Sequence, residues 1–215
     1  LRGIMLELER IANHLGDLGY LGNDVALSFG FVQFWRLKED LLRLNAELFG
    51  HRYLMDRVVP GGVACDLPRA QAQRLLEGLE RIQSEIATLK SIYEEHAGAQ
   101  DRFTMTGQVL PGLAEKMGLT GFAARASGIM HDLRIDFPIP PYQQVEVRLG
   151  SHTRGDVAAR VSVRFEELVE SIRLVQALAN QLPPGELRVA VGAAPGGARG
   201  IGWVEGWRGE VLIAL

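Results

Sequence analysis

Four long segments of the sequence repeat apolar residues at the spacing of an α-helix. They cover residues 1–21, 24–49, 67–96 and 156–182. Within each segment the apolar side chains follow one another in steps of three and four, as Leu75, Leu79 and Ile82 do in the third. Such a stripe gives every helix one face that must be buried against a neighbour. The sequence therefore predicts a bundle of four long helices.

Shorter elements are predicted outside these four segments. Residues 113–117 and 122–126 read as short helices bounded by glycine, and residues 144–149 alternate as a strand does. Alternation also predicts a strand at 187–191 and a hairpin over 202–215 that turns around residues 206–209. The predicted fold is mainly α, of the α+β kind, with a long-helix bundle and a small antiparallel β appendage.

This pattern predicts how the chain is divided. Residues 1–182 form the helix-bundle core, with a glycine-rich insertion at 98–155, and residues 183–215 form a small β region. The first helical stripe already runs at Leu1, and an apolar, strand-like run still continues at Leu215. We therefore expect the chain to be a piece of a longer protein, truncated at both ends.

Composition excludes several classes of function. A net charge of −3 gives no electrostatic reason to expect a nucleic-acid partner. Cys65 is the single cysteine, so the chain can form neither an internal disulfide nor a multi-cysteine metal site. No apolar run reaches the roughly 20 residues that a membrane-spanning helix needs. A reducing, cytoplasmic compartment is the simplest interpretation.

The first helical segment carries polar residues on or beside its apolar stripe. Asn13, His14, Asp17 and Asp24 are interleaved with leucine and isoleucine. Burying such groups is costly unless each finds a partner. His14 is interpreted either as a structural histidine bonded to Asp17 or as a functional group. Asp24 is either the cap of the second helix or a functional acid.

A charged run, His51–Arg57, lies between the end of the second helical segment and the turn at Pro60-Gly61-Gly62. Such a run is either a solvated loop or a docking surface, and composition does not choose between them. The glycine-rich stretch 192–200 lacks the lysine of a P-loop and is interpreted as a connector. No serine-protease-like or H-E-x-x-H signature is present.

Several motifs occur in collinear order over essentially the whole chain. They are Glu9–Leu15, Asn23–Asp24, Phe49–Val63, Arg125–Ile129, Asp132–Arg134, Arg154–Asp156, Leu182–Glu186, Gly202–Gly206 and Arg208–Glu210. Together they resemble the large subunit of membrane-bound NiFe hydrogenases of the formate hydrogenlyase and hydrogenase-4 type. That family is homologous to the 49 kDa subunit of respiratory NADH:quinone oxidoreductase (complex I).

The resemblance implies a hydrogenase large-subunit-like fold and an electron-transfer oxidoreductase subunit. It also implies a small iron–sulfur subunit as partner, within a multi-subunit complex at the cytoplasmic face of the inner membrane. In hydrogenase members two CxxC pairs, both outside the matched region, hold a Ni–Fe centre. Quinone-reducing members line a quinone cavity instead, and NAD is used only by the wider complex. This stretch by itself is expected to bind no cofactor or metal and to be inactive alone.

The resemblance also implies roles for individual residues. Asp24 matches an acid of the quinone cavity, so Asp24 and His14 are candidates for a proton path or the cavity wall. Arg52 matches an arginine near the iron–sulfur subunit. The quinone-reductase branch carries a histidine two positions later, where this sequence has Leu54. That departure argues against proton-coupled reduction of the terminal cluster, and His51 with the run Met55–Arg57 resembles the hydrogenase branch.

Two further groups of residues follow from the motifs. The expected interface with the iron–sulfur subunit consists of His51, Arg52, Asp56 and Arg57. Structural polar roles are expected for Arg125, Asp132, Arg134 and Asp156. The leading hypothesis is a hydrogenase-4-type large subunit. The alternatives are a 49 kDa-type subunit that lines a quinone cavity, a non-catalytic scaffold homologue, and an unrelated four-helix module.

Overall fold

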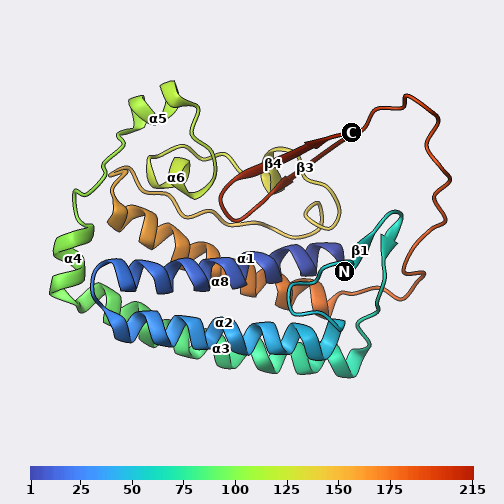
Figure 1. Cartoon of the computed structure of the whole chain (residues 1–215), viewed down its shortest axis with the longest axis horizontal. Helices are drawn as coiled ribbons and strands as arrows, with labels where there is room; N and C mark the ends of the chain where they lie inside the picture. The colour runs from blue at the N-terminus through green and yellow to red at the C-terminus, as the bar shows by residue number, and fades with distance from the viewer.

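The computed structural model describes residues 1–215, and four long helices dominate it. They are α1 (Arg2–Asp24), α2 (Ser28–Phe49), α3 (Arg69–Glu95) and α8 (Val157–Asn180). Helix α1 packs against α2 and α8, and α3 completes the bundle. Figure 1 shows the long helices side by side, with α5, α6 and the β3–β4 hairpin along one side of them, α4 at one end and β1 near the other. The predicted helix bundle is confirmed.

The core of the bundle is made of the predicted apolar stripes. On α1 the side chains of Leu8, Ile11 and Leu15 are fully buried. Phe34, Tyr93 and Phe165 meet at the centre, with ring centroids 5.3 to 5.8 Å apart. The Tyr93 hydroxyl donates a 2.7 Å hydrogen bond to the Leu18 carbonyl, which satisfies the one polar group of this cluster.

The tight approach of Tyr93 requires a glycine on α2. A Cβ atom at Gly30 would lie 2.5 Å from the Tyr93 hydroxyl oxygen. Any larger residue there would push the aromatic cluster apart. A glycine within a helix costs about 1 kcal/mol of stability relative to alanine. The close packing of Tyr93 against Gly30 offsets that cost.

Eight short elements complete the fold. They are α4 (Ala97–Phe103), α5 (Pro111–Met117), α6 (Gly121–Ala126), α7 (Leu133–Asp136), β1 (Val58–Val59), β2 (Gly62–Val63), β3 (Ile201–Glu205) and β4 (Glu210–Ala214). The strands form two antiparallel hairpins, β1–β2 and β3–β4. The β3–β4 hairpin turns at residues 206–209, as predicted, with Glu205 paired to Glu210. The predicted α5 and α6 are also present, with slightly different bounds.

Some sequence predictions are wrong. Residues 144–149 form no strand, because a side chain takes the place of a partner strand: the Arg148 backbone N–H donates to the Glu170 carboxylate at 2.8 Å. Residues 187–191 form no full strand either. They make a single bridge beside β2, with the Val63 N–H donating to the Leu187 carbonyl. Helices α4 and α7 and the β1–β2 hairpin were not predicted.

The helix caps also differ from expectation. Asp24 is the last residue of α1 and does not cap α2, whose N-cap is Leu27. Asp156 does cap α8, because its carboxylate accepts the Ala159 N–H at 2.8 Å. None of the helices combines the length and apolar character needed to cross a lipid bilayer. The division into a core at 1–182 and a β region at 183–215 stays a prediction.

Candidate functional site

Charged side chains line one face of α1. Glu7, Arg10 and His14 recur at one-turn spacing, so they project from the same side of the helix. Their exposed fractions are 0%, 1% and 0%. They face α8, the α6–α7 segment and the base of β3. We call the whole cluster the buried charge network; its members are Glu7, Arg10, His14, Arg125, Asp132, Arg134, Tyr142, Glu167 and Glu205.

Glu167 of α8 is the centre of this network. Its Oε2 accepts a 2.8 Å hydrogen bond from Arg10 Nη2, and its Oε1 accepts a 2.7 Å bond from Arg125 Nε. The Nε2 atom of His14 lies 3.2 Å from the same Oε2. One carboxylate therefore joins α1, α6 and α8 in the interior of the protein.

A second carboxylate, Glu7, joins α1 to the α7 segment. Arg134 Nη1 donates to both oxygens of Glu7 at 3.2 and 3.3 Å. The remaining donors of Arg134 bind Asp132 at 2.7 and 2.9 Å. The Tyr142 hydroxyl donates to Glu7 at 2.6 Å. Arg134 is thus held between two carboxylates, a geometry that suits the planar guanidinium.

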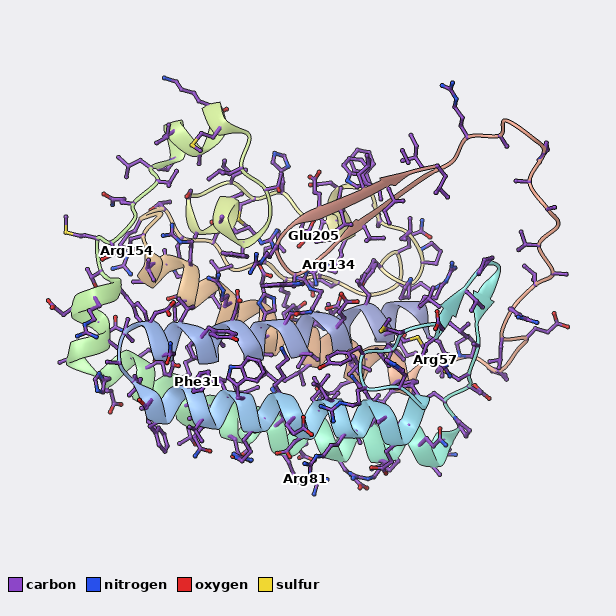
Figure 2. All side chains as sticks on the ribbon, viewed as in Figure 1. Phe31, Arg57, Arg81, Arg134, Arg154 and Glu205 are labelled. Carbon is purple, nitrogen blue, oxygen red and sulfur yellow. The ribbon has the colours of Figure 1, made fainter.

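Glu205 brings the β3–β4 hairpin into the same network. Its Oε1 accepts from Arg125 Nη1 at 3.3 Å, and its Oε2 accepts the Leu133 N–H at 3.2 Å. Arg10 Nη1 donates to the Gly206 carbonyl at 2.5 Å. Figure 2 shows Arg134 and Glu205 between the bundle and the hairpin. The hairpin is therefore fixed to the bundle through its turn end.

The charges of the network nearly balance. Four carboxylates (Glu7, Asp132, Glu167, Glu205) face three guanidiniums (Arg10, Arg125, Arg134), which leaves one formal negative charge when His14 is neutral. Two paired charges in an interior are tolerated only when the geometry is good, and removing one of them leaves an uncompensated buried charge. The network therefore couples five separate segments of the chain energetically.

The pKa values within the network diverge. Burial raises the pKa of Glu7, but the charges of Arg134 and Arg10 lower it by a larger amount, so the net shift is downward. For Glu167 burial is likewise outweighed, by His14, Arg125 and Arg10, and its pKa is lowered. Burial and the nearby Asp132 raise the pKa of Glu205.

His14 has a lowered pKa, because burial outweighs the attraction of Glu167. Neither ring nitrogen makes a well-aligned hydrogen bond, although Nε2 lies close to the Glu167 oxygen. The T-shaped packing of Trp207, 6.4 Å away between ring centroids, covers the imidazole from the hairpin side. A neutral histidine beside an ionised carboxylate can accept a proton while its side chain keeps the same position.

The predicted pairing of His14 with Asp17 is wrong. Asp17 accepts a 2.9 Å hydrogen bond from Arg164 Nε on α8, and Glu167 is the carboxylate next to His14. The reason is tertiary: α8 crosses this face of α1 and brings its own charges, which neighbours along a single helix cannot predict.

Asp24 lies apart from the network. It is exposed, at the last residue of α1, whereas Arg52 follows the end of α2. Because α1 and α2 run antiparallel, these two positions lie at opposite ends of the bundle (Figure 1). The structure therefore does not bring His14, Asp24 and Arg52 together, and the role of each stays a prediction.

The residues predicted at the interface form the loop His51–Arg57, before β1. Arg52 makes a bidentate pair with Glu39 of α2 at 3.0 and 2.6 Å, and this pairing lowers the pKa of Glu39 to about 2. His51 Nδ1 accepts the N–H groups of Tyr53 and Met55 at 3.2 and 3.3 Å. The loop is thus held in one shape by its own side chains.

The second half of the loop, Asp56 and Arg57, forms no ion pair within the chain. Asp56 is exposed and adopts a left-handed φ of 59°. Arg57 donates to the Met55 and Phe49 carbonyls at 3.2 and 3.4 Å. Two adjoining clefts, of about 310 and 460 Å³, lie between this loop and α1. Leu54 lines both clefts.

The polar residues predicted from the motifs divide into two places. Arg125, Asp132 and Arg134 belong to the buried charge network, and Asp156 caps α8 while also accepting the Met105 N–H at 3.0 Å. Five members of the network were missed by sequence reasoning: Glu7, Arg10, Tyr142, Glu167 and Glu205. The one-turn spacing of charged residues on the first helix was the signal that could have found the first two.

The donor set of this chain does not suit a Ni–Fe centre. Cys65 is the single cysteine, and burial raises the pKa of its thiol, which disfavours the thiolate that a metal binds. No group of three or more histidine, cysteine, aspartate or glutamate side chains is arranged to hold a metal ion.

Residues 24–195 match a model of the family described as respiratory-chain NADH dehydrogenase, 49 kDa subunit. The chain belongs to this family. It is 31% identical to an NADH-quinone oxidoreductase subunit of Thermosipho melanesiensis, over 89% of this chain and 52% of that protein. It is 28% identical to the membrane-bound hydrogenase subunit alpha of Pyrococcus furiosus, over 99% of this chain and 53% of that protein.

The fold is shared with a solved respiratory complex. A chain of the archaeal membrane-bound sulfane sulfur reductase superposes with a TM-score of 0.90, at 22% identity, over 99% of this chain and 60% of that chain. This likeness shows the fold alone. The chain spans about half the length of the curated relatives that it matches. Its relatives are oxidoreductase subunits of the NADH-quinone oxidoreductase and hydrogenase kinds.

Proposed function

We propose that this chain is the central part of the large subunit of an electron-transfer oxidoreductase of the hydrogenase-4 or formate-hydrogenlyase type. It works within a membrane-associated complex, at the cytoplasmic face of the inner membrane, against a small iron–sulfur subunit. The family match over residues 24–195 and the 28% identity to a membrane-bound hydrogenase subunit support this proposal. The chain supplies position, burial and charge, while the redox groups belong to the rest of the complex.

The observation that carries the hydrogenase assignment is Leu54. It occupies the position at which the quinone-reductase branch has a histidine, and it lies between the two clefts beside α1. A leucine cannot take up or release a proton. Proton-coupled electron transfer at that position is therefore not available to this chain. The same loop still holds Arg52 in a fixed pair with Glu39.

A second candidate function is that of a 49 kDa-type subunit lining a quinone cavity. The family model that matches is the 49 kDa model, and relatives of the NADH-quinone oxidoreductase kind reach 31% identity. Asp24 would then belong to the cavity wall, where its exposure at the end of α1 leaves it free to meet a partner chain. A non-catalytic scaffold role is the third alternative.

The two functions separate in one experiment on the full-length complex. The purified complex is assayed for hydrogen-dependent reduction of a viologen dye and, separately, for NADH-dependent reduction of a quinone. Hydrogen-dependent activity together with bound nickel supports the first proposal. Quinone reduction without nickel supports the second proposal. If an intact complex shows neither activity, the scaffold role is supported.

The role of Asp24 is tested by Asp24→Asn in the same complex. If Asp24 passes protons, turnover should fall by about tenfold or more, while assembly and melting temperature stay unchanged because the side chain is exposed. Asp101→Asn, an equally exposed acid on α4, is the matched control. Wild-type turnover in the Asp24 variant would show that this carboxylate has no part in proton transfer.

A further inference from the structure

The larger cleft beside α1 holds oxygen atoms that lack a cationic partner. This cleft of about 460 Å³ is walled by α1, α2 and the His51–Arg57 loop. Glu9 and Asp56 line it, both are exposed, and neither has a basic side chain within ion-pair distance. Exposed acids without a partner also occur elsewhere on the surface, as at Glu80 and Asp101, but Glu9 and Asp56 line one cleft together.

A buried, unsatisfied oxygen lies in the wall of the same cleft. Asn45 of α2 is 2% exposed, and its Nδ2 donates to the Arg52 carbonyl at 3.3 Å. Its Oδ1 accepts no hydrogen bond. Buried polar atoms are nearly always partnered, and leaving one unpaired costs about 1–3 kcal/mol. The cleft therefore lacks a donor.

The basic residues of the cleft do not supply that donor. Both outer nitrogens of Arg52 are held by Glu39. The Lys38 ammonium lies 4.7 Å from the Trp35 ring centroid and feels the charge of Asp17, so it is directed along α1 and away from Glu9 and Asp56. The two free carboxylates are thus available to a group from outside the chain.

The rest of the wall suits a long aliphatic stem. Ala12, Leu42 and Leu54 line the cleft between the polar groups. Tyr53 and Met55 stand at its rim, each 60% exposed. Aromatic and methionine side chains are enriched at protein interfaces. Arginine and lysine combine an apolar stem with a cationic, hydrogen-donating end, so they match both parts of this wall.

We propose that the cleft receives an arginine or lysine side chain of the small iron–sulfur subunit, bound between Glu9 and Asp56 and close to Asn45. The inference rests on the proposed function, because it takes that subunit as the partner. The acids at the cleft attract the basic end, and Ala12, Leu42 and Leu54 contact its stem. The loop's own pairing, with Arg52 held by Glu39, keeps the cleft open before the partner arrives.

The test measures the affinity of the full-length large subunit for its iron–sulfur subunit. The double variant Glu9→Gln with Asp56→Asn removes both charges at nearly constant shape. Because removing the charge of one partner of an interfacial ion pair weakens binding, we expect the dissociation constant to rise roughly tenfold or more. The dependence of affinity on salt should also become weaker.

The matched control is Glu80→Gln with Asp101→Asn, one glutamate and one aspartate that are exposed and unpaired elsewhere on the surface. It should leave the dissociation constant within about twofold of wild type. Equal melting temperatures of the three proteins exclude misfolding as the cause. A change below about threefold in the cleft variant overturns the inference and leaves the proposed function intact. If the wild-type subunit does not bind the iron–sulfur subunit at all, both proposals fail.

Discussion

The buried charge network and the cleft beside the His51–Arg57 loop are both rich in carboxylates, yet their charges are balanced in different ways. In the network each carboxylate meets at least one arginine of the same chain, across contacts between α1, α6, α7, α8 and β3. At the cleft, Glu9 and Asp56 face solvent without a partner. The first arrangement joins separate segments of the fold through ion pairs of the chain itself. The second is the one that, in our proposal, a partner completes.

The polar residues of α1 do not all share one role. Glu7, Arg10 and His14 face the interior, whereas Glu9 lies on the opposite, cleft-facing side of the same helix. One helix therefore contributes to the buried network with one face and, in our proposal, to a partner surface with the other. If this division holds, the interior region depends on its charges for stability far more than the loop does.

The largest effect is expected at Glu167. Glu167→Ala leaves Arg10 and Arg125 buried without their shared carboxylate, and breaking a buried ion pair costs about 3–5 kcal/mol. Urea unfolding followed by circular dichroism measures the loss in the free energy of unfolding. Glu94→Ala, in an exposed pair with Lys90 on α3, should change it by less than about 1 kcal/mol. Similar losses in the two variants would contradict the special role of the network.

Acid should weaken the interior region of the fold. Glu7, Asp132 and Glu167 have folded-state pKa values below their ordinary ones, since arginines outweigh burial. Their stabilising contribution is therefore present above the unfolded-state pKa of about 4 and is lost as pH falls through the folded-state values. The free energy of unfolding, measured by urea titration at a series of pH values, should fall steadily below about pH 4.

Glu205 has the opposite sign, because burial and Asp132 raise its pKa. Its contribution is fully present below the unfolded-state pKa and is lost as pH rises through the folded-state value. The three lowered carboxylates outnumber it, so they set the net slope. A free energy of unfolding that stays constant or rises on acidification below about pH 4 would show that the network is not ionised as described.

A smaller loss is expected at Glu205 itself. Glu205→Gln keeps an oxygen for the Leu133 N–H and removes a charge that burial already disfavours. The loss should be about 1–3 kcal/mol, the cost of a weakened buried hydrogen bond, and below that of the Glu167 variant. Thermal unfolding gives the ranking. A larger loss for Glu205 than for Glu167 would place the centre of the network at the hairpin.

The smallest effect is expected in the loop. Glu39→Gln breaks the pairs with Arg52 and Arg43, both of which are partly exposed. Exposed ion pairs contribute about 0–1 kcal/mol, so the melting temperature should barely change. Binding to the iron–sulfur subunit should weaken instead, because the released Arg52 can enter the neighbouring cleft. If this variant loses stability as Glu167→Ala does, the distinction between the two regions is wrong.

The long helices and the β3–β4 hairpin were predictable from the sequence, because their signals are local. Leu8, Ile11 and Leu15 recur at helical spacing, and Gly206 and Gly209 mark the turn. The same local logic failed at residues 144–149, which alternate like a strand but have no strand beside them. Alternation describes a pattern of burial, and only the position of Glu170 decides what the Arg148 N–H binds.

The site was predictable only in pieces. The collinear motifs pointed to Arg125, Asp132 and Arg134, and the structure places all three in one cluster. The motifs did not indicate that Glu167 is their common partner. Nor did they separate the inward-facing Glu7 from the cleft-facing Glu9, since both lie on one short stretch of α1.

By itself, the sequence determined where the four long helices lie, where the β3–β4 hairpin turns and which family the motifs resemble. The tertiary structure alone decided which charges meet. The bond from Arg10 to the Gly206 carbonyl joins residues 196 positions apart. Periodicity reaches over a few turns of helix, whereas electrostatic pairing acts across whatever the fold brings within a few ångströms. For this reason the buried network emerged from the packing of α1, α8 and the hairpin.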